Sequence, residues 1–358
     1  MNIKVCRQID YITEEMAMLE RLAGSGENVS EEKRKRLSQK VLSRIQISED
    51  LVAKVKERLA PKMEKVEFYF KKLPNLSFCM AEAVLLYVPE DKAVNADMLH
   101  SYALSLSEDE KNSRFLQLQS FDTENEDTPG LREAERWIER LDTEDEIKWR
   151  VFQAYMRREE YVEELIPFFK TAEEILVQAK DRWEPVLEAF ERFWKRKAEE
   201  RSVIDDICHV FGINVTDRKK GKSIVLRPWL VAYNQLSFRV MDDQEDDYFI
   251  GVIFGDDFYF DTTREDSLKQ GEILSILKLL SDKSKFEILL SVRDRKVYGA
   301  QLAKQMGLTT ATISYHMNGL VERGLVNLER IDNRIYFSLN KEKIKALADS
   351  LSALFLQE

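Results

Sequence analysis

The 358-residue chain has few of the residues that mark secreted or membrane proteins. It contains three cysteines, Cys6, Cys79 and Cys208, which are odd in number and far apart. This usage fits reduced cytosolic thiols better than a disulfide framework. No run of eighteen apolar residues occurs, and the first residues, MNIKVCRQID, lack the apolar core of a signal peptide. We therefore expect a cytoplasmic protein that does not contact a membrane.

Catalytic sequence motifs are also missing. The chain has no phosphate-binding glycine loop, no G-x-S-x-G elbow and no HExxH helix. The acidic run DDQEDD (242–247) lacks the glycine and the closing glutamate of an EF-hand loop, so we interpret it as a solvated hairpin tip. The sequence predicts a protein that is not an enzyme and uses no cofactor.

The charge of the chain is unevenly distributed. Hydrophobic residues make up 44% and charged residues 34%, which predicts a folded globular protein of more than one domain at this length. The net charge is −10, yet residues 271–358 hold 13 Lys and Arg against 10 Asp and Glu. DNA is a polyanion, so we expect any nucleic-acid contact in this mildly basic part rather than in the acidic remainder.

The periodicity of apolar residues divides the chain. Helical spacing dominates up to residue 211, and near Gly212 the period changes to two. The expected short strands are 2–6, 213–216, 223–232, 235–241, 248–254 and 257–260. The predicted fold is mainly α, with these parts: a helical effector or assembly domain (1–211), a small antiparallel β-sheet attached to it (212–260), a linker (261–270) and an α+β domain (271–358).

Two aromatic clusters occur in the helical part. Their members are Tyr161, Phe168 and Phe169, and Trp183, Phe190, Phe193 and Trp194. Helical spacing fits either a packing core or the lining of an apolar ligand pocket. The sequence does not separate the two interpretations.

The most specific pattern lies at residues 297–339. It predicts a helix over 299–306, ended by Gly307, because glycine tolerates the positive φ of a helix C-terminus. Thr309 then offers an oxygen to the free amides of a second helix. The segments LVNLERI and RIYFSL alternate apolar and polar residues, as the two strands of a half-buried hairpin do.

The second helix of this pattern has two unlike faces. Ile313, Met317 and Leu320 point inward at i, i+4 and i+7. The opposite side is slender, polar and uncharged, which suits the DNA major groove. We assign contacts with base edges to Thr310, Ser314 and Tyr315, on the first turns, with Asn318 on the same side. We expect Thr309, Thr312 and His316 to contact phosphate or to cap the helix. Arg330 and Arg334 flank the hairpin turn, and we expect them to meet the DNA backbone or the minor groove.

The stretch LTTATISYHMNGLVERGLV resembles a winged helix-turn-helix of the ArsR type. Upstream, LKLLSDKSKFEILLSV is similar to that family's opening helix pair, and downstream LNKEKIKALADSLSALF is similar to its closing helix. The likeness covers about residues 271–356. It implies a transcription regulator that binds duplex DNA. The long N-terminal part resembles the extra domain of long-form ArsR-type regulators, which implies a module for an effector or for assembly.

The resemblance also bears on metals. In the metal-sensing branch of the family, two cysteines flank one residue in the helix before the recognition helix. Tyr298 and Ala300 occupy those places here, and residues 341–356 contain no histidine for the family's other metal site. The adjacent pair Cys208-His209 does not form a chelate by itself, because neighbours on a helix point about 100° apart. We expect no metal site.

Apolar stripes mark the opening and closing helices. In the resembled family these two helices form a homodimer interface, which implies this set: Ile273, Ile276, Leu277, Leu280, Ile344, Leu347, Leu351, Leu354 and Phe355. The stripes also fit an internal contact with the protein's own N-terminal part, which is the alternative to the dimer interface. The competing function is a protein-interaction adaptor whose winged helix docks a protein instead of DNA.

Overall fold

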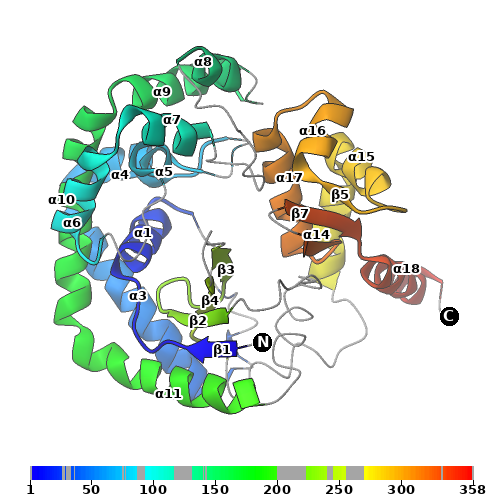
Figure 1. Ribbon diagram of the computed structural model, residues 1–358. Helices are drawn as coiled ribbons and strands as arrows, with labels where there is room; N and C mark the ends of the chain where they lie inside the picture. Colours follow the sequence, from blue (N-terminus) through cyan, green and yellow to red (C-terminus); the bar gives the residue numbers. More distant parts are fainter. Residues whose placement is uncertain are drawn as a thin grey trace.

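Figure 1 shows the computed structural model of the chain. It describes residues 2–25, 29, 34–35, 37–74, 76, 78–86, 93–116, 131–139, 141, 143–199, 223–239, 245–254, 270–331 and 334–356. The helices of the N-terminal part form an arc, the small sheet lies inside that arc, and the C-terminal module lies on its open side (Figure 1). Within the described ranges every helix is too short or too polar to serve as a membrane span.

The N-terminal part is mainly helical. Its α-helices are α1 (Tyr11–Leu22), α3 (Gln39–Leu59), α4 (Met63–Phe70), α5 (Met80–Leu85), α6 (Ala96–Ser105), α7 (Glu108–Leu116), α8 (Leu131–Glu139), α9 (Asp145–Met156), α10 (Arg158–Gln178) and α11 (Lys180–Glu199), with a 3-10 turn, η1 (Ala60–Lys62), between α3 and α4. Side chains of Asp10, Ser38 and Asn95 accept hydrogen bonds from the first-turn amides of α1, α3 and α6. Such caps satisfy amides that have no partner within the helix.

Both aromatic clusters belong to the packed core of this part. Phe168, Phe169, Trp183 and Trp194 are all buried. The rings of Phe70 and Phe169 lie 6.0 Å apart, and those of Phe193 and Trp194 lie 5.2 Å apart. All four belong to the hydrophobic core, which supports the packing interpretation, and Phe168 in addition lines a surface pocket with Pro61 and Pro167.

The sheet of the N-terminal part is mixed, which corrects the prediction of an antiparallel sheet. Its strand order is β1 (Asn2–Val5), β2 (Ser223–Trp229), β4 (Glu245–Gly251) and β3 (Leu236–Arg239). The pairs β1·β2 and β2·β4 are parallel, and β3·β4 is antiparallel. The expected strands 213–216 and 257–260 lie outside the described residues.

A buried turn explains the mixed order. After β2 the chain does not form a tight hairpin, because α1 and α3 hold residues 230–233. Glu14 accepts from the amides of Leu230 and Val231 at 2.6 and 2.8 Å, and Ser48 donates to the Val231 carbonyl at 2.9 Å. The chain therefore leaves the position next to β2 empty and forms β3 one position further along the sheet. Strand β4 then returns and fills the position between β2 and β3.

The acidic run also differs from its prediction. Residues 245–247 belong to β4 rather than to a solvated tip, and residues 242–244 lie outside the described ranges. Asp247 is 6% exposed, and its Oδ1 accepts from Arg227 Nε at 2.8 Å. Arg227 on β2 thus balances the charge of the buried Asp247 carboxylate. The sequence pattern of alternating apolar and polar residues does not predict that burial.

The C-terminal module has its own hydrophobic core. Its elements are α14 (Gln270–Ser281), α15 (Lys283–Ser291), β5 (Val297–Tyr298), α16 (Gly299–Met306), α17 (Thr310–Glu322), β6 (Val326–Ile331), β7 (Arg334–Leu339) and α18 (Lys341–Phe355). The three strands form one sheet in the order β5-β7-β6. Leu236 of β3 packs against this core and also against the N-terminal one. The mainly α fold with a winged module at the C-terminus is confirmed.

Candidate nucleic-acid interface

The turn between α16 and α17 has the predicted geometry. Gly307 adopts φ +69°, a left-handed conformation that favours glycine, and the amide of Leu308 donates to the Ala303 carbonyl at 3.0 Å. Thr309 Oγ1 accepts from the amide of Thr312 at 3.0 Å and so caps α17. Both helix ends at the turn are satisfied by local bonds, which fixes the angle between the helices.

Helix α17 rests on the core through the three predicted residues. Ile313, Met317 and Leu320 are each 0% exposed. At about 100° per residue, the outward direction lies near Tyr315, roughly 200° from Ile313. Tyr315 and Asn318, together with Thr310 at the helix start, are half-buried. These three are the candidates for base contact that the structure leaves accessible.

Ser314 does not face outward, which corrects its prediction. It lies only about 100° from Ile313, on the flank of α17, and is 4% exposed. Thr312 lies on the other flank at 0% exposure, where its hydroxyl is 2.9 Å from Thr309 Oγ1. Thr309 and His316 are likewise buried. Thr309 and Thr312 bond to each other at the start of α17, whereas His316 lies against Lys285 of α15.

Lys285 of α15 supports the recognition helix, a role that the sequence pattern does not predict. Its Nζ lies 3.3 Å from His316 Nδ1 and 5.3 Å from the centre of the Tyr315 ring. The same ammonium lies 3.3 Å from Asp282 Oδ2, and Asp282 caps α15 by accepting from the Lys285 amide at 2.9 Å. Burial raises the pKa of Asp282, but the Lys285 amide and ammonium outweigh it and hold that pKa below its usual value. The capping aspartate marks the start of α15 in the sequence, but it does not indicate the contact of Lys285 with α17.

The β6–β7 hairpin forms the wing. Its register pairs Arg330 with Ile335 and Ile331 with Arg334, so both arginines stand at the last two pairs before the tip. Their side chains, and residues 332–333, lie outside the described part. At the opposite edge of the wing, Tyr298 of β5 pairs with Tyr336, and their rings are 5.5 Å apart.

The expected interface stripes divide into buried and exposed members. Ile273, Ile276 and Leu347 are at most 5% exposed and belong to the module's own core, so for them the prediction of a free face is wrong. One module buries them because α14 and α18 contact each other. Three more pack partly against the same core: Leu280, Ile344 and Leu351. The large apolar residues that are exposed on these two helices are Leu274 (56%), Leu277 (38%), Leu354 (51%) and Phe355 (78%).

The two positions that hold thiolate ligands in metal-sensing members of the family lie at the end of β5 and in the first turn of α16. Tyr298 ends β5, Ala300 lies in the first turn of α16, and neither side chain can ligate a metal as a thiolate does. Cys208 and His209 lie outside the described residues. His100 Nε2 lies 2.7 Å from Glu163 Oε1 on the surface of the helical part.

One potential ligand cluster occurs elsewhere among the described residues. Ligand atoms of Glu20, Cys79 and Glu82 lie within 4.8 Å of one another. Lys72 Nζ stands between the carboxylates, 2.9 Å from Glu20 Oε1 and 2.7 Å from Glu82 Oε2. Burial raises the pKa of the Cys79 thiol well above its usual value, which disfavours a thiolate. A protein ammonium therefore holds the position that a cation would take.

Comparison with known proteins matches the module just described. The family model "Bacterial regulatory protein, arsR family" matches residues 282–327, from the cap of α15 to the start of β6. The arsenical resistance operon repressor of Staphylococcus xylosus is 30% identical over 83 residues, which are 23% of this chain and 80% of that protein. The transcriptional activator HlyU of Vibrio cholerae is 24% identical over 82 residues, 23% of this chain and 76% of that protein.

Among solved structures, reduced HlyU from Vibrio cholerae N16961 matches with 21% identity and a TM-score of 0.20, covering 24% of this chain and 92% of that one. The family-model match, residues 282–327, falls on the capped helix-turn-helix and the elements that support it. The chain belongs to the ArsR family of bacterial regulatory proteins, the helix-turn-helix regulators of transcription that bind DNA.

Proposed function

We propose that this chain regulates transcription by binding duplex DNA as a homodimer through its C-terminal winged helix. The observation that carries the proposal is the coincidence of the family match, residues 282–327, with a capped helix α17 on a well-packed core. A helix of this kind fits the major groove and reads base edges through its first turns.

The half-buried residues of α17 support a specific assignment of roles. Thr310, Tyr315 and Asn318 are uncharged hydrogen-bonding groups that are only half-buried, and we assign base contacts to them. The buried Thr309, Thr312, Ser314 and His316 hold the helix start in place. Arg330 and Arg334 on the wing bind phosphate, because arginines at a hairpin tip reach the backbone beside the groove.

The exposed leucines and phenylalanine of α14 and α18 support dimerisation. Leu274, Leu277, Leu354 and Phe355 belong to two helices that touch each other, so they can form one continuous apolar surface. A second copy would cover this surface across a two-fold axis. The two recognition helices would then enter successive major grooves about 34 Å apart, on an inverted repeat.

The N-terminal part is proposed as the effector or assembly domain. Its helices and its sheet share one core, since Ile224 and Leu226 of β2 cluster with residues of α1, α3 and α10. We therefore place one boundary in the proposed linker, 261–270, and treat the 212–260 region as part of the helical domain's fold. The effector is proposed to be a non-metal ligand, in keeping with the residues at the family's thiolate places.

Selection of bound fragments from random duplex DNA by the full-length protein tests this function. The proposal expects enrichment of an inverted repeat, bound by two protomers with an affinity that falls steeply as salt rises. Failure to enrich any duplex, together with salt-insensitive binding to a protein partner, would favour the adaptor alternative.

A further inference from the structure

The net positive charge of the C-terminal module comes from one stretch of the chain. Residues 293–304 hold four cations against a single carboxylate, whereas the rest of 271–358 holds nine Lys and Arg against nine Asp and Glu. The four cations are Arg293, Arg295, Lys296 and Lys304. Three of them lie in the loop between α15 and β5, and the fourth lies in the last turn of α16. The contacts proposed above for α17 and the wing use none of these residues.

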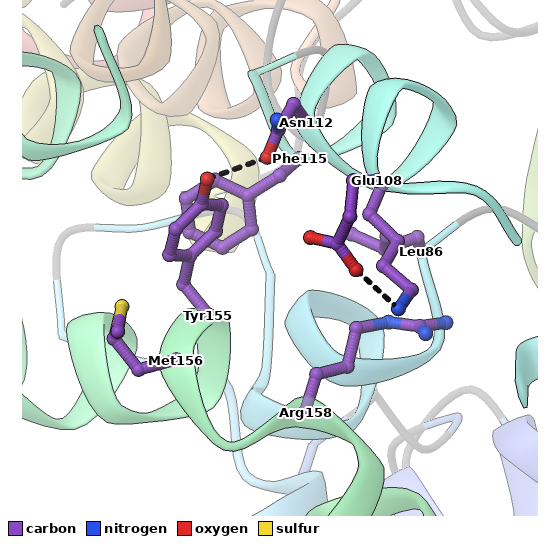
Figure 2. Close-up of a pocket in the computed structure, with 8 residues that line it drawn as sticks. Leu86, Glu108, Asn112, Phe115, Tyr155, Met156 and Arg158 are labelled. Carbon is purple, nitrogen blue, oxygen red and sulfur yellow. Dashed lines mark hydrogen bonds and ion pairs between the residues drawn. The ribbon is translucent and has the colours of Figure 1, made fainter. Parts of the chain in front are cut away.

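Ion pairs balance many cations of this chain. Figure 2 shows an example beside a small pocket of the helical part, where Glu108 Oε1 accepts from Lys111 Nζ at 2.8 Å. Arg293 is balanced in the same way, since its Nη2 lies 2.7 Å from Asp294 Oδ2. The charge of Arg293 is therefore already matched within its own loop.

Arg295 and Lys304, which we call the basic surface, differ from Arg293. Both are exposed, and among the residues that the structure describes no carboxylate forms an ion pair with either of them. Arg295 bonds to Gln305, the residue after Lys304, so the two cations lie close together at the end of α16. Two exposed positive charges without a local counter-charge attract a polyanion.

A chain of hydrogen bonds holds Arg295 in place. Its Nη2 donates to Gln305 Oε1 at 3.0 Å, and Gln305 Nε2 donates to Ser291 Oγ at 3.2 Å. The Ser291 hydroxyl in turn donates to the Glu287 carbonyl at 2.9 Å. The bond to Gln305 uses only one of the five N–H donors of a guanidinium, so the others can form the paired bonds that phosphate oxygens accept.

These bonds place Arg295 beside the start of the recognition helix. Gln305 lies in the last turn of α16, two residues before the tight turn at Gly307, and Thr310 begins α17. Helices α16 and α17 pack against each other. The two DNA backbones border the major groove, so a cation beside the start of a helix in that groove meets phosphate.

We propose that Arg295 and Lys304 bind the DNA phosphate backbone and that Gln305 positions Arg295 for this contact. The inference rests on the proposed function and adds a phosphate-binding surface that is separate from the wing. Contacts with phosphate carry no sequence information, so the basic surface contributes affinity and orientation rather than the choice of sequence. The acidic remainder of the chain is the competing partner for these cations.

Titration of the full-length protein with its selected duplex at several salt concentrations tests the basic surface. Arg295→Gln should make the slope of log K against log salt about one unit shallower, and Arg295→Gln/Lys304→Gln about two units shallower. The ranking of duplex sequences should not change, because no base contact is lost. A native slope in either folded variant overturns the proposal.

Two controls separate this contact from a general effect of charge. Arg293→Gln/Asp294→Asn removes both members of an ion pair in the same loop, so its slope should remain native. Lys341→Gln removes one exposed cation at the start of α18, the helix assigned to dimerisation, and should also keep the native slope. A slope as shallow in Lys341→Gln as in Arg295→Gln would overturn the assignment to Arg295.

Gln305→Ala tests the positioning role, because it keeps every cation and removes only the bond to Arg295. Its slope should stay native, while its affinity should fall roughly two- to tenfold, since the arginine must then be ordered on binding. Native affinity in this variant overturns the role of Gln305. Tighter binding by Arg295→Gln than by the native protein would assign Arg295 to the acidic part of the chain instead. A native protein that binds no duplex contradicts the proposed function and this inference together, whereas a native slope in Arg295→Gln contradicts this inference alone.

Discussion

Tyr315 of α17 packs against the residues that support this helix and is also a candidate for base contact. Its ring contacts Lys285 from α15 and lies 5.4 Å from the His316 ring, in an edge-to-face arrangement. The neighbouring His316 Nδ1 faces the Lys285 ammonium and so acts as the acceptor. The tyrosine is therefore held by residues that do not themselves contact solvent freely, which limits the positions that its hydroxyl can take.

This placement leads to a prediction for base reading. Tyr315→Ala should cost about 1–3 kcal/mol on the preferred duplex and relax selection at one base position, since the variant can no longer bond to that base. Tyr315→Phe is the matched variant, because it keeps the ring on Lys285 and removes only the hydroxyl. Binding titrations on duplexes that differ at single positions measure both. If Tyr315→Ala weakened every duplex equally, the residue would not read a base.

Buried carboxyls lead to a prediction for stability against pH. Glu14 is 1% exposed, and burial raises its pKa to about 8, although the amides of Leu230 and Val231 oppose the shift. The unfolded chain releases this proton near pH 4.5, whereas the folded protein keeps it to about pH 8. The unfolded state thus binds fewer protons across this window, so the free energy of unfolding should fall as pH rises through it.

Denaturant unfolding at several pH values measures the effect. Glu14 alone should contribute a decrease of up to about 1.4 kcal/mol per pH unit between these limits. Glu14→Gln should show a flatter dependence of unfolding free energy on pH, even if one of the hydrogen bonds from the amides of Leu230 and Val231 is broken. Glu67→Gln removes an exposed carboxyl on α4 and should retain the native slope. A profile for Glu14→Gln as steep as that of the native protein would contradict the shift.

At the scale of elements, the wing has a testable electrostatic role. Arg330 and Arg334 occupy the last two pairs of β6 and β7, so both would meet the DNA backbone together. Removing one arginine–phosphate pair lowers the slope of log K against log salt by about one unit. The double alanine variant should therefore show a slope about two units shallower in titrations over a range of salt. An unchanged slope would place the wing away from the DNA.

The closing helix leads to a prediction for assembly. Leu351 packs partly against the module's own core, so changing it perturbs folding as well as association. Phe355 is 78% exposed and avoids this ambiguity. Phe355→Asp should weaken dimerisation roughly 30-fold or more, as expected for a buried aromatic anchor worth at least about 2 kcal/mol. Val177→Asp places the same charge on α10 at 50% exposure and should remain dimeric. Sedimentation compares the two, and a dimeric Phe355→Asp protein would rule out this interface.

The elements that the sequence predicts well are those determined by local interactions. Gly307, Thr309 and the alternation of the β6–β7 hairpin act within a few residues, so their outcome can be read from the chain. The prediction that Ser314 faces outward is wrong, because the exposure of a side chain on α17 depends on its angle from the buried face and not on its polarity. The role of Lys285 escapes local patterns because its partner, His316, lies 31 residues away. The order of the N-terminal sheet joins residues 2–5 to residues 223–226, and no local pattern indicates such a pairing.

At the scale of the whole molecule, two cores are joined by few described residues. Leu236 of β3 packs against both, while the remaining members of the C-terminal core come from residues 273–351. The fragment 271–358 is therefore expected to fold and to bind the same duplex as the full protein, without any response to an N-terminal ligand. A fragment that folds but does not bind would assign dimerisation to the N-terminal domain instead.

The central claim is that two copies of this chain bind duplex DNA through their winged helices. Titration of the full-length protein onto its selected duplex, followed by sedimentation at several salt concentrations, tests the claim most directly. We predict a complex of two protomers per duplex, whose affinity falls as salt rises and which Phe355→Asp does not form. A complex with one protomer per duplex, or an affinity that does not change with salt, would contradict the account.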